Sequence, residues 1–474
     1  MGQAPRELSP SASASHLFGA ELRRWRVCRG LSQRRLGELV LNSGALIAKI
    51  EKADRTPNLN LARRLDGALG TGHTFQRMWS LIERESRSDG QRTGAGDAEP
   101  ASDDLGPVWA SSLVATVEAV GTLWRADLER RSAIIGSAWI ASGFALSSRA
   151  WLASPHDAEV SRAVGRRVGQ ADVDALWSMC HAFADADHQL GGGYARSTVV
   201  HYINDVVHPL LEGSYTDEIG RRLMAAAARV CDLSAFMAFD SGRQGLAQRQ
   251  YVQALRLAKA SGNETLGVHI LADMSMQAHY LNAPQALELA EAGVRTASAC
   301  GSYASLARCS ALAARAHAKR GDAAACWKSM TEAESALARA RSADEPAWIR
   351  FFTHQQLYAE FMYAAGDLGH AAMVRRFAPA VVATTDSMQR RRVLATATLA
   401  ATYATSSEDG NADADVERAC AILGEIVPVA GALTSLRSLE AVNRVRRKLA
   451  PYAQQPAVKE IEDRFRIAFG AVSR

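Results

Sequence analysis

A cluster of histidines and aspartates lies mid-chain, in the stretch HAFADADHQLGGGYAR that begins at His181. His181, Asp185 and His188 recur at helical spacing and would share one helix face, with Asp187 beside them. Such groups can bind a divalent metal, and three following glycines could wrap a phosphate. We favour the plainer interpretation, in which the glycines at 191–193 end one helix and the acids and histidines are solvated or capping groups. No flanking strand pattern or GK[ST] motif supports phosphate binding.

Motifs for nucleophilic or metal-assisted catalysis are absent from the sequence. Because there is no GxSxG, HExxH or Cys–His signature, we predict that the chain is not an enzyme and expect no cofactor and no metal. The seven cysteines are scattered without a CxxC pair, which is typical of buried, reduced thiols in a cytoplasmic protein. No apolar run approaches the roughly 18 residues that span a bilayer, so no membrane partner is expected.

Positive charge is concentrated near the N-terminus. The 474 residues are 48% apolar and 22% charged, an ordinary globular balance. Residues 18–84 hold 13 Lys/Arg against 6 Asp/Glu, whereas the rest of the chain holds 42 against 44. This asymmetry favours a polyanionic partner for the N-terminal segment alone. The alternative is an arginine-rich surface that is simply solvated.

Five short helices are predicted in this basic segment, over 18–29, 32–40, 43–52, 59–70 and 73–84. Ser32 is the expected N-cap of the second helix, and Ser43 or Asn42 that of the third. Gly30 follows the first helix as a stop signal. Apolar side chains at helical spacing can close over one small core. The predicted core residues are Leu22, Trp25, Leu31, Leu36, Leu39, Leu46, Ile47, Ile50, Leu61, Leu65 and Leu69.

The order of signals in this segment is L-S-Q, LGEL, LIAKIE, TPN and LARRLDGALG. It resembles the Cro/C1-type, or XRE, helix-turn-helix family over about 65 residues. The resemblance implies that the third helix enters the major groove of double-stranded DNA and that its N-terminal half faces base edges. It also implies that Gln33 supports that helix and touches DNA. A generic five-helix interaction module is the alternative.

The resemblance places small residues where relatives carry larger polar groups. Glycine offers no side chain and alanine can only touch a thymine methyl group, so Lys49 is the one long donor on this face. Basic residues around the motif would instead hold phosphates. The predicted DNA-binding residues are Gln33, Arg34, Ser43, Gly44, Ala45, Ala48, Lys49, Lys52 and Arg55.

Two turn positions depart from the family pattern. Leu41 replaces the usual glycine between the second and third helices, and Ala53 replaces the glycine after the third helix. We expect both substitutions to strain or shift their turns.

The rest of the chain divides by composition. Residues 1–16 are small and polar and are predicted to be a disordered tail, and residues 85–107 a flexible linker after the DNA-binding domain at 17–84. Residues 108–215 are predicted to be helical but irregular. Residues 216–452 follow as repeats, and 453–474 as a terminal helix and tail. Tryptophans at helical spacing are predicted to lie in the core: Trp109, Trp124, Trp139, Trp151, Trp177, Trp327 and Trp348.

Turn residues recur at intervals of 39 to 45 residues through the C-terminal part, at Gly242, Asn282, Gly321, Gly366 and Gly410. Each turn would join two alanine-rich helices, and such a period predicts a solenoid of helical hairpins. The segment is similar to tetratricopeptide repeats, although these units are longer than usual. An irregular α-bundle is the alternative. The predicted fold is therefore all-α.

A helix-turn-helix segment, a linker and a repeat body together resemble the large transcriptional regulators of actinobacterial type. The resemblance implies a homodimer that binds operator DNA and receives a peptide, small-molecule or protein signal in the repeat groove. The candidate groove residues are His269, Gln277, Tyr280, Arg350, His354 and Tyr358. The alternative function is a protein-interaction scaffold whose N-terminal segment no longer discriminates DNA sequences.

Overall fold

The computed structural model describes residues 18–19, 22–23, 25–27, 29–69, 71, 75–76, 79, 82, 109–129, 138–383, 388–404 and 412–470. These residues are helical and contain no strand beyond two isolated bridges, which confirms the predicted all-α fold. The chain divides into two compact units, residues 1–102 (the head) and residues 103–474 (the body). The predicted tail at 1–16 and linker at 85–107 lie outside the described residues.

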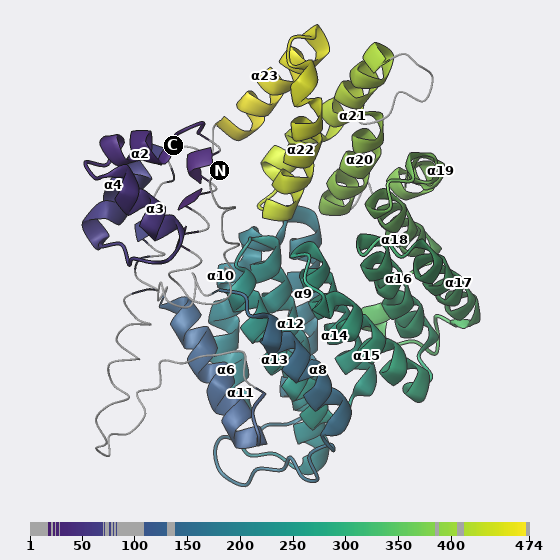
Figure 1. The fold of residues 1–474 in the computed structure, drawn as a ribbon. Helices are drawn as coiled ribbons and strands as arrows, with labels where there is room; N and C mark the ends of the chain where they lie inside the picture. Colours follow the sequence, from purple (N-terminus) through teal and green to yellow (C-terminus); the bar gives the residue numbers. More distant parts are fainter. Residues whose placement is uncertain are drawn as a thin grey trace. The chain divides into compact units, whose positions relative to one another are not determined.

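The head has three helices with defined bounds: α2 (Gln33–Leu39), α3 (Gly44–Glu51) and α4 (Leu59–Leu69) (Figure 1). Helical residues also occur within 18–27 and 75–82, where the first and fifth helices were predicted. The core contains every predicted residue except Leu39, whose side chain is exposed. It also contains residues that the prediction missed: Phe18, Val40, Ala62, Ala68, Phe75, Trp79 and Ile82.

The first part of the body packs directly on the repeats that follow it. Its elements are α6 (Leu113–Leu128), α8 (Ala141–Ala153), α9 (Gln170–Leu190), α10 (Gly192–Tyr202), the π-helix η2 (Ile203–Val207) and α11 (His208–Leu211). One hydrophobic core runs from Val117 to Ala316 and crosses the predicted boundary at 215. Trp124 Nε1 donates to Ser234 Oγ at 3.2 Å, for example. The irregular region and the first hairpins therefore share one core.

Helical hairpins make up most of the remaining body (Figure 1). Their helices are α12 (Asp217–Asp240), α13 (Gln244–Ser261), α14 (Glu264–Tyr280), α15 (Gln285–Cys300), α16 (Tyr303–Lys319), α17 (Ala323–Arg339), α18 (His354–Asp367), α19 (Ala371–Val382), α20 (Gln389–Tyr403) and α21 (Ala412–Ala432). Gly242, Asn282 and Gly321 sit at predicted turns with φ of 83°, 55° and 75°. A left-handed residue after each first helix lets the chain reverse.

The fourth predicted turn residue was wrong by three positions. Gly366 lies inside α18, and the left-handed residue is Gly369, with φ of 78°. The amide of His370 then donates to the carbonyl of Ala365 at 2.9 Å, which closes the helix end. The fifth, Gly410, lies outside the described residues.

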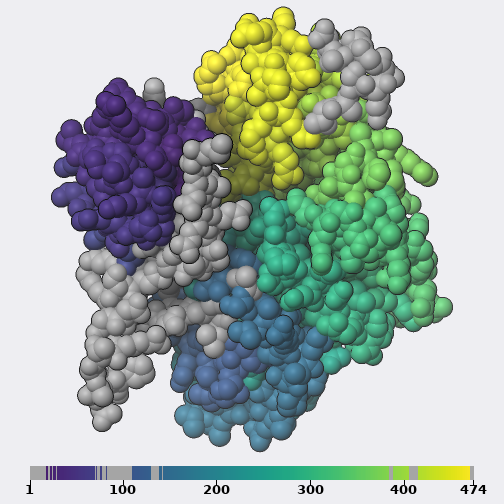
Figure 2. All heavy atoms as spheres, in the orientation of Figure 1, coloured from purple at the N-terminus to yellow at the C-terminus, as the bar shows by residue number. Residues whose placement is uncertain are grey.

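The C-terminal helices form one packed lobe within the body. The 3-10 helix η3 (Ala347–Ile349) precedes α18, and α22 (Leu436–Leu449), η4 (Ala450–Tyr452) and α23 (Pro456–Gly470) follow α21. Residues of α20 to α23 share a core, and Figure 2 shows α22 and α23 in yellow within this lobe. None of the helices in the described part is both long and apolar enough to cross a bilayer. The six cysteines described are free thiols, and all but Cys300 are buried.

Candidate functional site

Helices α2 and α3 approach each other at two glycines. A Cβ atom on Gly44 would lie 2.7 Å from Arg34 Cα, and one on Gly37 would lie 2.7 Å from the Gly44 nitrogen. Both distances are shorter than any tolerable contact, so larger residues would force the helices apart. This corrects the interpretation of Gly44 as a base-facing position that lacks a side chain. Gly44 faces α2, and its small size sets the angle at which α3 leaves the turn.

Serine caps begin both helices of this pair, as predicted. Ser32 Oγ accepts from the Arg35 amide at 3.1 Å, and Ser43 Oγ accepts from the Leu46 amide at 3.2 Å. Each cap satisfies one of the free amides at a helix start. The Ser43 side chain therefore has a structural role at the start of α3.

The two residues that replace the usual turn glycines both adopt the left-handed backbone conformation. Leu41 has φ of 55° and Ala53 has φ of 59°. A residue with a Cβ pays about 1–2 kcal/mol for this conformation, whereas glycine does not. Both turns therefore keep a glycine-type geometry without glycine.

Restoring glycine at these turns should stabilise the head. Leu41 is 79% exposed, so Leu41→Gly removes strain with little loss of packing. After allowing for the greater freedom of glycine in the unfolded chain, we expect a gain of about 0.5–1 kcal/mol for Leu41→Gly and a similar gain for Ala53→Gly. Hydrogen exchange of the α2–α4 amides in the full chain measures the gain. Leu41→Ala is the control, since it keeps the left-handed cost; equal protection in Leu41→Gly and Leu41→Ala would refute the strain.

The end of α3 is held by a buried carboxylate. The Glu51 side chain is fully buried and accepts from Arg26 through both oxygens, one of them at 3.0 Å from Arg26 Nη2. Gln33 Nε2 donates to Glu51 Oε2 at 2.7 Å. Gln33 thus ties the start of α2 to the last residue of α3. This contact explains how Gln33 can support the third helix.

The remaining predicted DNA-binding residues lie on an accessible surface of the head. Gln33 and Ala48 are partly buried, and the other positions besides Gly44 are exposed: Arg34, Ser43, Ala45, Lys49, Lys52 and Arg55. Arg34 and Arg35 pair with Glu38 at 3.2 and 3.0 Å, and these bonds lower the pKa of Glu38. Lys49, Lys52 and Arg55 hold no ion pair with any residue that the structure describes. Within the described part of the head, these three cations are therefore free to pair with an external anion.

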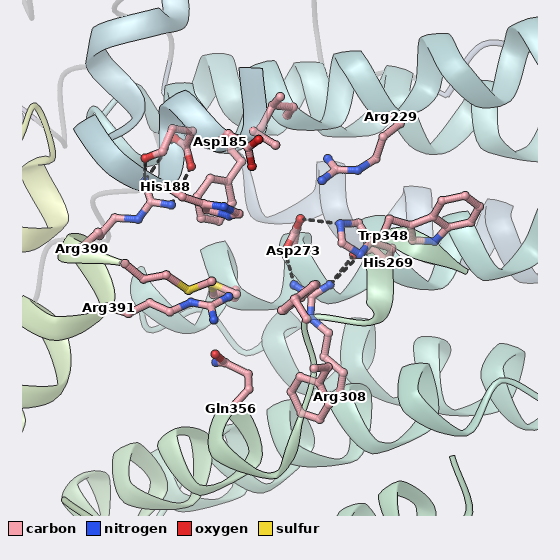
Figure 3. A pocket seen from close by; sticks show the side chains of 18 of the residues that line it. Asp185, His188, Arg229, His269, Asp273, Arg308, Trp348, Gln356, Arg390 and Arg391 are labelled. Atoms are coloured by element: carbon pink, nitrogen blue, oxygen red, sulfur yellow. Dashed lines mark hydrogen bonds and ion pairs between the residues drawn. The ribbon is translucent and has the colours of Figure 1, made fainter. Parts of the chain in front are cut away.

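A cavity of about 290 Å³ lies in the body, among α9, α12, α14, α16, α18, α20, α22 and the segment 347–352. Figure 3 shows charged side chains directed into it from several helices. Of the six predicted groove residues, His269 alone lies on its wall. The cluster His181, Asp185, Asp187 and His188 also lies there, as do Trp177 and Trp348, which were predicted to be core residues.

The other predicted groove residues do not line this cavity, and their contacts show why. Gln277 donates to the Gln244 carbonyl at 2.8 Å, and Tyr280 donates to Glu440. Arg350 bonds the Glu345 carbonyl at 2.9 Å, and the Tyr358 ring stacks on Phe377. His354, at the start of α18, is exposed. The sequence pattern placed these polar and aromatic residues on first helices, but it could not show which helix faces line the cavity.

Asp187 is not the solvated or capping group that the sequence suggested. Its side chain is 2% exposed and accepts from Arg390 Nη2 at 2.7 Å and from Arg390 Nη1 at 3.1 Å. Arg390 lies 203 residues further along the chain, which no local pattern could indicate. The glycines do end α9 as predicted, since Gly191 has φ of 86° between α9 and α10.

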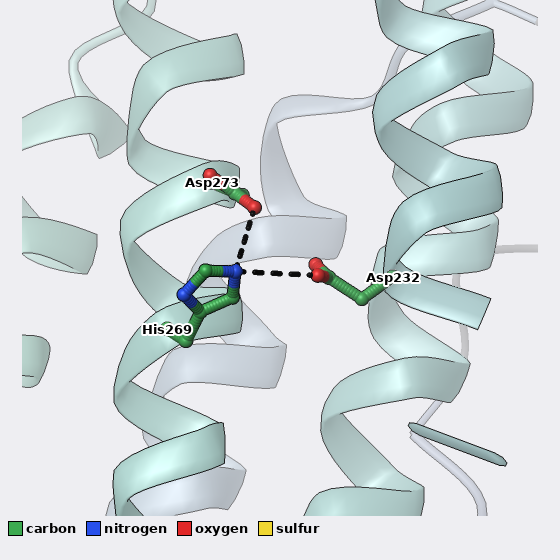
Figure 4. A group of neighbouring side chains, drawn as sticks. All are labelled: Asp232, His269 and Asp273. Carbon is green, nitrogen blue, oxygen red and sulfur yellow. Dashed lines mark ion pairs between the residues drawn. The ribbon is translucent and has the colours of Figure 1, made fainter. Parts of the chain in front are cut away.

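A buried group of metal-type ligands, Asp232, His269 and Asp273, lies beside the cavity, with ligand atoms within 4.8 Å of one another (Figure 4). Arginine side chains already bond to all three of these residues. Arg229 bonds Asp232 at 2.8 Å, and Arg308 bonds both Asp273 and His269 Nδ1. Because arginine only donates, His269 Nδ1 must accept, and Nε2–H then faces the two carboxylates at 3.6 Å. The group fits an ion-pair network better than a metal centre.

Burial acts strongly on this network. Burial, with the charges of Arg308 and Arg229, lowers the pKa of His269 well below its usual value, so the imidazole is neutral. Burial and the neighbouring Asp273 raise the pKa of Asp232 to about 8.

Comparison with known protein families gives one match in the head. Residues 17–74 match a family described as a helix-turn-helix domain. The matched range contains the α2–turn–α3 unit, both glycines of its crossing and the three free cations. The chain thus carries a helix-turn-helix domain of the DNA-binding kind. Neither the curated proteins nor the solved structures gave a significant match.

Proposed function

We propose that the chain is a transcriptional regulator of the XRE, or Cro/C1, type, which binds operator DNA through its head. The observation that carries this proposal is the free, exposed cationic surface of Lys49, Lys52 and Arg55 on a helix-turn-helix domain. In such domains the second helix of the motif lies in the major groove. These cations would hold phosphates, which supply most of the affinity of a duplex-binding protein.

Sequence discrimination by one head would be weak. Ala45 is exposed on α3, but its side chain can only contact a methyl group. The space that a side chain at Gly44 would need is filled by the backbone of α2. Lys49 would make the single long contact, to guanine or to phosphate. One bidentate base contact contributes about 1–3 kcal/mol of discrimination, so specificity would depend also on DNA shape and half-site spacing.

A dimer would compensate for a weak head. Two heads joined through their bodies act at a high effective concentration, and their half-sites would lie about 34 Å apart. The body would provide dimerisation and receive a signal, and its hairpins are similar to tetratricopeptide repeats. Signal binding that changed the head spacing would need a coupling of only about 1–3 kcal/mol. This cytoplasmic role includes no catalytic step.

Genome-wide binding of the full chain, compared with Lys49→Ala and Arg34→Ala, tests the regulator. We expect discrete sites for the wild type and loss of most of them in both variants, because each variant removes a cation that is worth up to about tenfold in affinity. Arg320→Ala, an exposed arginine of the body, is the matched control and should leave the sites unchanged. Scattered recovery that the variants do not alter would instead favour the interaction scaffold.

A further inference from the structure

Arginines dominate the polar lining of the body cavity, and all but one of them have an acidic partner. The pairs are Arg229 with Asp232, Arg308 with Asp273, Arg315 with Glu360, Arg390 with Asp187 and Arg437 with Asp240. The exception is Arg391 on α20, which has no ion pair with the residues described.

Arg391 is held by an aromatic ring instead of a carboxylate. Its guanidinium carbon lies 5.3 Å from the centre of the Phe351 ring. Burial lowers the pKa of Arg391, which means that its charge is poorly compensated. In Figure 3 Arg391 and Gln356 both point into the open centre of the cavity. The lining acid without an ion pair among described residues is Asp185, but it is exposed and therefore screened by water.

Three buried polar atoms on cavity-lining residues have no hydrogen-bond partner among the described residues. They are Trp348 Nε1, Arg315 Nε and Arg437 Nε. All three are donors. These atoms are almost inaccessible, so they add positive polarity to the cavity wall but make no direct contact with a ligand. The group that would contact an anion is the unpaired cation, Arg391.

Aromatic side chains form part of the remaining lining. Trp177 and Trp348 stack with ring centres 5.4 Å apart and planes at 11°. Phe351 lies between Arg308 and Arg391, at 5.3 Å from each guanidinium carbon. Aromatic side chains of this kind pack well against the flat, apolar ring of a ligand. The volume of about 290 Å³ lies at the small end of ligand pockets, which are roughly 300–1,000 Å³.

We propose that the cavity binds a small aromatic carboxylate, whose carboxylate group pairs with Arg391 and whose ring lies against the wall of Trp177, Trp348 and Phe351. This inference rests on the proposed sensing role of the body and names the class of its signal. The carboxylate supplies the ion-pair partner that Arg391 lacks among the described residues, and the ring replaces water against the aromatic wall.

Calorimetric titration of the full chain, without DNA, tests the proposal with matched pairs of probes. The probes are benzoate, indole-3-acetate and 2-naphthoate, each compared with its neutral amide. We expect at least one carboxylate to bind ten or more times more tightly than its amide. Arg391→Met should weaken that carboxylate at least tenfold and leave the amide unchanged. Arg376→Met, an exposed arginine on α19 outside the lining, should change neither.

The comparison of acid with amide on the wild-type chain needs no variant, so misfolding of Arg391→Met cannot hide the answer. The proposal is overturned if no carboxylate binds more tightly than its amide, or if a folded Arg391→Met chain binds the acid as the wild type does. Carboxylate binding by a chain that ignores duplex DNA would keep the ligand class and remove the regulator. Duplex binding without carboxylate binding would keep the regulator and overturn the proposed ligand class.

Discussion

Replacing Arg390 with methionine is expected to destabilise the body by about 3–5 kcal/mol. The Arg390 side chain is 8% exposed and lies between Asp187 and Asp240, which are 2% and 0% exposed. It bonds Asp187 at 2.7 Å and Asp240 at 3.1 Å. Burial disfavours the guanidinium charge, but the two carboxylates outweigh burial and raise the pKa of Arg390. Removing the cation would leave the buried Asp187 without an ion-pair partner among the described residues, and Asp240 with Arg437 as its remaining ion-pair partner at 3.9 Å.

This ion-pair group also joins distant parts of the body. Asp240, the last residue of α12, accepts from the Gly192 amide at 3.0 Å and from Ser435 Oγ at 2.9 Å. Thr434 exchanges backbone bonds with Leu190 and Gly193 nearby. The group therefore ties α20 and the start of α22 to α9, α10 and α12. Loss of Arg390 should loosen the cavity wall as well as lower stability.

Urea-induced unfolding of the full chain, with hydrogen exchange at α9 and α20, measures the effect of Arg390→Met. The double variant Arg390→Met/Asp187→Asn removes one of the stranded charges and should recover part of the loss. A single variant within about 1 kcal/mol of the wild type would show that the buried ion pairs are not coupled to folding. If the loss of unfolding free energy in the double variant equalled the sum of the losses in the two single variants, Arg390 and Asp187 would likewise not be energetically coupled.

Replacing Glu51 with alanine is expected to destabilise the head by about 2–4 kcal/mol and to weaken duplex binding. Glu51 is fully buried, and its loss would leave Arg26 and Gln33 without their shared acceptor. Arg26 is 14% exposed and can partly reach water, which limits the cost. Since Glu51 fixes the end of α3, that helix would lose its position as well as its stability.

Glu51→Gln separates charge from shape. It should cost about 1–2 kcal/mol, because the amide keeps an acceptor for Arg26 but not the charge. Glu38→Ala is the matched control, since Glu38 is exposed and pairs with Arg34 and Arg35 on the surface; its cost should stay below about 1 kcal/mol. Hydrogen exchange of α2–α4 amides measures all three. A Glu51→Ala head as stable as Glu38→Ala would contradict the anchoring role.

Local signals were sufficient to predict the head. The serine caps and the apolar spacing placed α2 and α3 within one residue of their observed bounds. The role of Gly44 was missed because it depends on how closely α2 passes, which only the packed pair shows. Leu39 fits the helical period but faces outward, because Val40 supplies the core contact at the end of α2.

The body shows where local pattern fails. Turn residues such as Asn282 are local signals and were found, but Gly366 and Gly369 are near equivalents, and hydrophobic period alone cannot choose between them. The cavity lining runs from Trp177 to Arg437 in the sequence. Its arginines come from α12, α16, α20 and α22, so no short window of sequence contains them all. Asp187 looked like a surface acid for the same reason.

Fluorescence anisotropy of duplex binding by the full chain, measured across a range of salt concentration, tests whether the head binds DNA through its free cations. We expect tight binding in dilute buffer and a steep fall with salt, with about 0.9 in log–log slope for each phosphate that is neutralised. The triple variant Lys49→Ala/Lys52→Ala/Arg55→Ala should reduce that slope by about two to three. Absence of duplex binding in dilute buffer, or an identical slope in the triple variant, would contradict this expectation.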